Sequence, residues 1–112
     1  MVKLRGVNVY PMACLPAVRS DSRTTGEWLC EAYTVESGST LRDEMIVHVE
    51  IRKDAGNLDG LQEKLATRLR SDLGVSVEVK LADQGQLETV ANLGEGKAKR
   101  LLDRRTAYTK KN

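Results

Sequence analysis

Two segments of the chain alternate between apolar and polar residues, a pattern typical of β-strands with one buried face. The apolar positions are Met45, Val47, Val49 and Ile51 in the first segment and Val75, Val77, Val79 and Leu81 in the second. The pattern therefore predicts strands over 45–52 and 75–81. His48 lies on the more polar face of the first strand, where we expect an exposed strand residue and not a catalytic one.

Between these strands, apolar residues recur at spacings of three and four, which places them on one face of a helix. They are Leu58, Leu61, Leu65 and Leu69. Asn57 or Asp59 can cap the start of this helix, and Gly74 stands where a left-handed C-terminal cap is expected. We interpret the leucine face as part of the core and not as a cofactor site.

The first residues predict a tight hairpin over 1–10. Valine and leucine positions alternate on both sides of Arg5-Gly6, and glycine readily takes the positive φ that such a reversal needs. The apolar stretch 12–19 is short and is interrupted by Pro16, so it predicts one or two helical turns at most.

The other segments are assigned from their polarity and glycine content. Residues 20–26 are polar and predict a loop, whereas 28–35 is compatible with a strand. A polar, glycine-punctuated loop is expected over 82–96. After it, we expect Leu101-Leu102 to dock the chain back onto the domain.

In order, these elements predict an α+β fold in which a β-hairpin precedes a small, mainly antiparallel sheet with helices packed on one face, of ferredoxin-like or ACT-like type. We expect a single domain over 1–112, with the hairpin at 1–10, a β-β-α-β core at 26–81, a loop at 82–105 and a basic tail at 106–112. Such folds host many functions, so topology alone does not choose among them.

Composition fits a soluble globular domain with one modest core, and several kinds of site are disfavoured by it. Phenylalanine is absent, so the core must be built from leucine, valine and isoleucine. No window approaches the ~20 apolar residues of a membrane helix and no secretory signal is evident, so we expect a cytoplasmic protein without a membrane partner. Cys14 and Cys30 have neither metal-site spacing nor disulfide density, and we expect buried or half-buried free thiols. A single histidine excludes a two-histidine metal site, and we expect no metal ligands.

Positive charge is concentrated at the C-terminal end. Residues 96–112 hold seven of the 18 Lys and Arg but one of the 16 Asp and Glu. Within this segment, Lys97 follows two glycines, so it can reach an anionic phosphate or carboxylate. A solvated basic tail is the alternative. Nucleic acid is disfavoured as a partner, because Tyr108 is the tail's sole aromatic residue and no binding motif accompanies it.

Two separated motifs resemble one family. Residues 3–11 (KLRGVNVYP) resemble the "RGVNVFP"-like hairpin that opens the small C-terminal domain of phenylacetate–CoA ligases, and 95–105 (EGKAKRLLDRR) resembles the family's "EGKAKRVIDRR" ending. Between them, 65–81 is similar to its helix and strand of the "LRERLGLSVEVRLV" kind. The resemblance covers nearly the whole chain in the right order. These enzymes are AMP-forming ligases that make an acyl-adenylate and then a thioester.

The resemblance implies specific roles for several residues. Lys97 matches the catalytic lysine that stabilises charge during adenylation. Gly6 and Val7 would border the CoA channel after the domain rotates, although Gly6 can equally be an ordinary turn glycine. Lys99 and Arg100 are candidate contacts to CoA phosphates, and a solvated basic face that also includes Arg104 and Arg105 is the alternative.

The resemblance also implies partners. ATP and CoA would be substrates of the full enzyme together with an aromatic or other small carboxylate, and Mg²⁺ would be bound mainly by a large N-terminal nucleotide-binding domain. The isolated domain would hold no cofactor and be inactive. Beginning almost at the expected hinge favours a piece of such a ligase.

This chain departs from the family pattern in two places. Residues 12–19 lack the usual glutamate-bearing helix, and the loop over 87–96 is longer than the common form and lacks its proline and arginine. Two alternatives therefore stay open. One is a free-standing ACT-like regulatory module that binds a small carboxylate, compatible with a homodimer, and the other is a basic-tailed interaction protein without a ligand.

Overall fold

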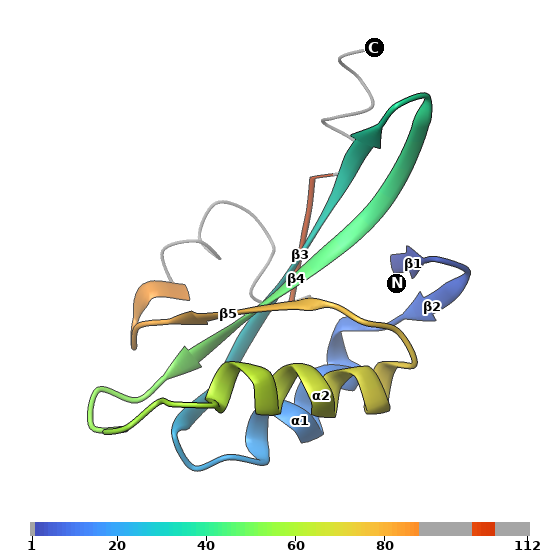
Figure 1. Ribbon diagram of the computed structural model, residues 1–112. Helices are drawn as coiled ribbons and strands as arrows, with labels where there is room; N and C mark the ends of the chain where they lie inside the picture. Colours follow the sequence, from blue (N-terminus) through green and yellow to red (C-terminus); the bar gives the residue numbers. More distant parts are fainter. Residues whose placement is uncertain (1, 88–99, 105–112) are drawn as a thin grey trace.

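The computed structural model describes residues 2–87 and 100–104, which form a four-stranded sheet, a separate hairpin, two α-helices and a short 3₁₀ helix (Figure 1). The elements in chain order are β1 (Val2–Leu4), β2 (Val7–Val9), the 3₁₀ helix η1 (Pro11–Cys14), α1 (Leu15–Arg19), β3 (Thr24–Ser37), β4 (Thr40–Ile51), α2 (Leu61–Leu73), β5 (Glu78–Ala82) and β6 (Leu101–Asp103). The predicted α+β class and the leading hairpin are confirmed.

The sheet has the order β5-β4-β3-β6 and is mixed. Its centre is the long antiparallel pair β3–β4, in which Trp28 lies opposite Val49. The outer strands join in parallel, β5 to β4 and β6 to β3. Parallel neighbours need a crossover connection, and α2 supplies it between β4 and β5. In Figure 1, α1 and α2 lie together on one side of the sheet.

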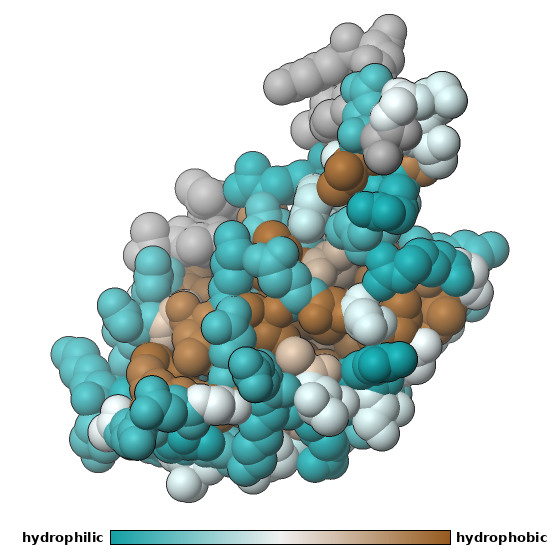
Figure 2. All heavy atoms as spheres, viewed as in Figure 1, coloured by the Kyte–Doolittle hydropathy of each residue, from teal (hydrophilic) through white to brown (hydrophobic). Residues whose placement is uncertain are grey.

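The core forms where the helices and the hairpin meet this sheet. Leu61, Leu65 and Leu69 are fully buried, which confirms three of the four leucines predicted on one helix face. The fourth, Leu58, precedes α2 and is only partly buried. Facing the three buried leucines are buried side chains of the sheet and of the hairpin, among them Trp28, Val47, Val49, Val2, Leu4 and Val9. Hydrophilic side chains border the apolar band that is visible in Figure 2. No helix in the described part of the chain is long and apolar enough to span a membrane.

The cysteines are buried free thiols, as predicted. Cys14 Sγ lies 3.8 Å from Cys30 Sγ, so the two thiols join η1 to the centre of β3. The hydrogen bond with Cys14, together with burial, raises the pKa of the Cys30 thiol far above its usual range. Cys30 therefore behaves as a neutral core residue.

The start of α2 differs from the prediction. The helix begins at Leu61 after Gly60, whose φ of 76° makes it a left-handed N-cap without a side-chain hydrogen bond. Neither Asn57 nor Asp59 caps the helix, because Asn57 Oδ1 accepts the backbone N–H of Asp59 at 2.8 Å and closes a local turn instead. The C-terminal cap is confirmed, since Gly74 has φ 79° and donates to the carbonyl of Arg70.

Other segments were also predicted incompletely, and the strand predicted over 75–81 begins only at Glu78, as β5. β3 begins at Thr24, inside the loop expected over 20–26, because Thr24 already pairs with Ile51. Pro16 does not interrupt a helix but lies in the first turn of α1, where a missing N–H costs nothing. Leu101 and Leu102 dock as predicted, although they do so as a strand, β6, within the loop expected over 82–105.

Candidate functional site

The hairpin turn is the first part of the candidate site. Arg5 and Gly6 both have positive φ, 47° and 83°, the geometry of a two-residue turn that matches the twist of its strands. Gly6 is exposed, and a Cβ added there would meet no atom within 4 Å. Val7 is half-buried and lies against Gly74 at the end of α2. The turn therefore presents a small, open surface beside a buried hairpin.

The second part is the return of the chain to the sheet at Arg100. Its guanidinium lies 4.4 Å above the ring of Trp28, donates to the Trp28 carbonyl at 3.2 Å and pairs with the carboxylate of Glu27. The backbone of Arg100 has φ 56°, and its carbonyl accepts the N–H of Cys30 at 2.8 Å. These contacts occupy the guanidinium within the domain and make Arg100 the anchor at the start of β6.

A second arginine of this segment is also paired with a carboxylate of β3. Arg104 Nε lies 2.8 Å from Oε2 of Glu31, and Oε1 of the same carboxylate lies 2.9 Å from His48 Nε2. His48 is thus a half-buried partner of Glu31 and not a freely exposed strand residue. The two basic residues described at the C-terminal end are consequently both paired with carboxylates of β3.

The other predicted site residues lie outside the described residues. They are Lys97, Lys99 and Arg105, together with the basic tail at 106–112.

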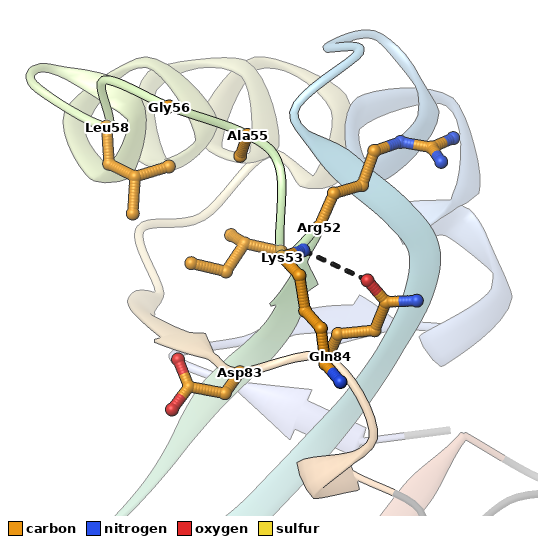
Figure 3. A pocket seen from close by; sticks show the side chains of 8 residues that line it. Arg52, Lys53, Ala55, Gly56, Leu58, Asp83 and Gln84 are labelled. Atoms are coloured by element: carbon orange, nitrogen blue, oxygen red, sulfur yellow. Dashed lines mark hydrogen bonds between the residues drawn. The ribbon is translucent and has the colours of Figure 1, made fainter.

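A pocket of 380 Å³ lies at the opposite end of β4 from the β3–β4 turn (Figure 3). Its lining combines Ile51, Arg52, Lys53, Ala55, Gly56, Leu58, Asp83 and Gln84. The Gln84 amide oxygen accepts the N–H of Lys53 at 2.9 Å and ties the end of β4 to the segment after β5.

The most strongly perturbed carboxylate is structural. Asp21 is 7% exposed and accepts hydrogen bonds at 2.9 Å from the guanidinium and backbone of Arg23 and from Lys64 Nζ. The bonds from Arg23, then that from Lys64, hold the pKa of Asp21 well below its usual range. The cluster fastens the loop before β3 to α2. Over 2–87 and 100–104, no group of three His, Cys, Asp or Glu side chains is placed to hold a metal ion.

A comparison of the sequence with known protein families identifies the family of this domain. The chain matches the family model of the AMP-binding enzyme C-terminal domain over residues 6–105, and it belongs to this family. The resemblance carried by residues 3–11 and 95–105 is therefore confirmed.

Individual relatives show which ligases this domain resembles. Phenylacetate-coenzyme A ligase of Pseudomonas putida is 30% identical over 112 residues, an alignment that covers 96% of this chain and 24% of that enzyme. A solved domain of phenylacetate-coenzyme A ligase from Bacteroides vulgatus ATCC 8482 has a TM-score of 0.74 and 28% identity, covering 94% of this chain and 92% of that one. A 2-hydroxyisobutyryl-CoA ligase in complex with 2-HIB-AMP and CoA, in the thioesterification state, gives 0.74 and 26% over 99% of this chain and 23% of that one. The chain thus spans about a quarter of the curated ligase.

The sequence identifies some residues of the candidate site but not the contacts of its arginines. The Arg5-Gly6 reversal and the Gly96-Lys97 motif were found from sequence, whereas the partners of Arg5 and Arg100 were missed. An arginine at a turn that demands positive φ was the available signal for Arg5, because such a conformation favours glycine or asparagine. For Arg100, no local signal identified Trp28 as its partner.

Proposed function

We propose that this chain is the C-terminal domain of an ATP-dependent, AMP-forming acid–CoA ligase of phenylacetate–CoA ligase type. The observation that carries the proposal is its similarity, over 99% of the chain, to a ligase solved with an acyl-adenylate and CoA together. The domain would act with a large nucleotide-binding domain, and the substrates would be ATP, CoA and an aromatic or other small carboxylate.

In the first half-reaction, a carboxylate oxygen attacks the α-phosphorus of ATP and anionic oxygens crowd the transition state. Lys97 would place a compact positive charge between acyl and phosphate oxygens and stabilise this charge. Support comes from its Gly-Lys context and from the anchoring of Arg100, three residues later, on Trp28. Lys99 would lie on the same basic segment as a candidate phosphate contact, while the contacts of Arg100 favour an anchoring role.

In the second half-reaction, the hairpin would border the channel through which the pantetheine thiol reaches the acyl-adenylate. Gly6 and Val7 would form its wall. The open space around Gly6 supports this role, because a Cβ added there would meet no described atom within 4 Å, while the positive φ is a separate reason for a glycine at this turn. Mg²⁺ would be bound mainly by the large domain.

The test measures the two half-reactions separately in the ligase that contains this domain. Lys97→Ala should slow pyrophosphate release by roughly 100-fold or more, the usual loss when a preorganised charge is removed from a transition state. Thioester formation from preformed acyl-adenylate should be largely retained. Lys80→Ala, at an exposed lysine of β5, is the matched control and should change neither rate.

Gly6→Leu should give the opposite profile, with normal pyrophosphate release and blocked thioester formation. Gly6→Ala is its control, because alanine suffers the same strain at φ 83° without the bulk. Equal losses in both half-reactions for Lys97→Ala, or none in either, would refute the assignment of Lys97.

A further inference from the structure

The hairpin turn carries an arginine where its backbone favours glycine. Arg5 has φ 47°, a left-handed conformation that is uncommon for residues with a side chain. The next residue, Gly6, already provides the conformational freedom that a reversal needs. A long cationic side chain at the first turn position therefore requires a reason beyond turn formation.

The contacts of the Arg5 guanidinium supply that reason. One Nη donates to Oε1 of Glu44 on β4, and the other donates to the carbonyl oxygen of Ser76, between α2 and β5. The partners are 39 and 71 residues away in sequence, so the two bonds join the turn to β4 of the sheet and to the segment between α2 and β5. The planar guanidinium suits this task because it presents donors in a rigid fork.

These two hydrogen bonds fix the position of the turn, whereas the strands of the hairpin are held by other contacts. The strands are already held by Val2, Leu4 and Val9, which are buried in the core. At the turn itself, Gly6 touches nothing within 4 Å, and Arg5 supplies the side-chain contacts that join the turn to the sheet in the described part of the chain.

Glu44 also pairs with a second arginine, Arg42, which can be compared with Arg5. Its second oxygen, Oε2, lies 2.7 Å from Arg42 Nε in an ion pair, so one carboxylate pairs with two arginines. Arg42 is the more exposed of the two and belongs to β4 itself, whereas Arg5 reaches across from the hairpin. Both side chains border a cavity of 390 Å³, so either can be truncated without removing a packed core group.

From this geometry we infer that Arg5 is a positioning residue for thioester formation. Through Glu44 and Ser76 it sets the direction in which the Gly6 turn faces the thiol-bearing substrate. The inference rests on the proposed function, since it concerns the same channel wall. It adds that the wall is orientated by a clasp between the hairpin and the sheet.

The test uses the ligase that contains this domain and four variants. Arg5→Ala should slow thioester formation from preformed acyl-adenylate by roughly tenfold or more, with a raised KM for CoA, because ångström-scale misplacement of a positioning group is sufficient for such a loss. Pyrophosphate release should stay at the unmodified rate. Arg5→Lys should recover part of the loss, since an ammonium group can still pair with Glu44, although it lacks the two-pronged geometry of the guanidinium. The rate of thioester formation in Glu44→Gln should lie between the rates of Arg5→Ala and Arg5→Lys. Arg42→Ala is the matched control and should change neither half-reaction.

Three results would overturn the inference. They are an unchanged thioester rate in Arg5→Ala, an equal loss in both half-reactions, and the same loss in Arg42→Ala, which would indicate a general effect of charge near Glu44. Thermal unfolding of each variant tests folding, and Arg5→Lys and Glu44→Gln carry the test if Arg5→Ala does not fold. Gly6→Leu and Lys97→Ala are measured in the same assay. If they show their expected split while Arg5→Ala has no effect, only the positioning role fails, and if they show no split, the proposed function fails.

Discussion

Replacing Leu65 of α2 by alanine tests whether the leucine face is the main support of the fold. Leu65 and Leu69 are both 0% exposed and pack in the cluster that joins the helix, the sheet and the hairpin. Truncating a fully buried leucine costs about 2–5 kcal/mol, from lost transfer free energy and from the cavity left behind. Leucine and alanine are both good helix formers, so the loss reports packing and not helix propensity.

The expected loss converts into a measurable shift of the melting temperature. An unfolding entropy of about 2.1 cal/mol/K per residue amounts to about 0.24 kcal/mol/K for a domain of this length. A loss of about 3 kcal/mol then lowers the melting temperature by about 12 °C. Circular dichroism at 222 nm on the unmodified chain and on the Leu65→Ala and Leu69→Ala variants would measure this shift.

The matched control is Ser71→Ala, at an exposed position of the same helix. It should change the free energy of unfolding by less than about 0.5 kcal/mol, or about 2 °C. Unchanged melting in both leucine variants would refute the packing argument. A large shift in Ser71→Ala would show that the helix is supported by its outer face instead.

The remaining predictions concern activity, pH and the anchor of β6. The 112-residue chain, incubated with ATP, Mg²⁺, phenylacetate and CoA, should release no AMP above a blank, and robust turnover would refute its assignment as one domain of a larger ligase. Because the folded-state pKa of Asp21 is lowered, its stabilisation is complete above the unfolded pKa near 4 and is lost as pH falls below it. Asp21→Asn should therefore flatten the acid side of the stability profile, and an unaltered profile would contradict this. Arg100→Ala should cost about 0.5–2 kcal/mol through loss of the contact with Trp28 and should change tryptophan fluorescence, while an unchanged spectrum would argue against the stacking.

Local patterns were sufficient for most of the fold. Three features depend only on residues a few positions apart in sequence. They are the alternation over 45–52, the leucine spacing of the helix and the Arg5-Gly6 reversal. The cap at Gly74 was predictable for the same reason. The start of α2 was not, because Asn57 closes a turn with Asp59 that competes with capping, and sequence alone does not rank the two arrangements.

In the candidate site, too, some residues were identified from the sequence and some contacts were not. Gly6 and Lys97 were identified from short motifs, one by its turn chemistry and the other by its glycine context. The clasp of Arg5 on Glu44 and the anchor of Arg100 on Trp28 were not predicted, since each joins residues that lie 39 or more positions apart. A charged residue in a chain with many charges has numerous potential partners, and only the folded backbone selects one.

The sequence by itself therefore determined the α+β class, the leading hairpin, most of the leucine face of α2 and the family of the domain. Tertiary structure decided the order of the strands, the mixed character of the sheet and the pairing of β6 with β3. It also decided which carboxylates hold Arg5, Arg100 and Arg104. The physical reason is that periodic burial is encoded over a few residues, whereas strand order and ion pairing depend on where distant segments meet after the core has formed.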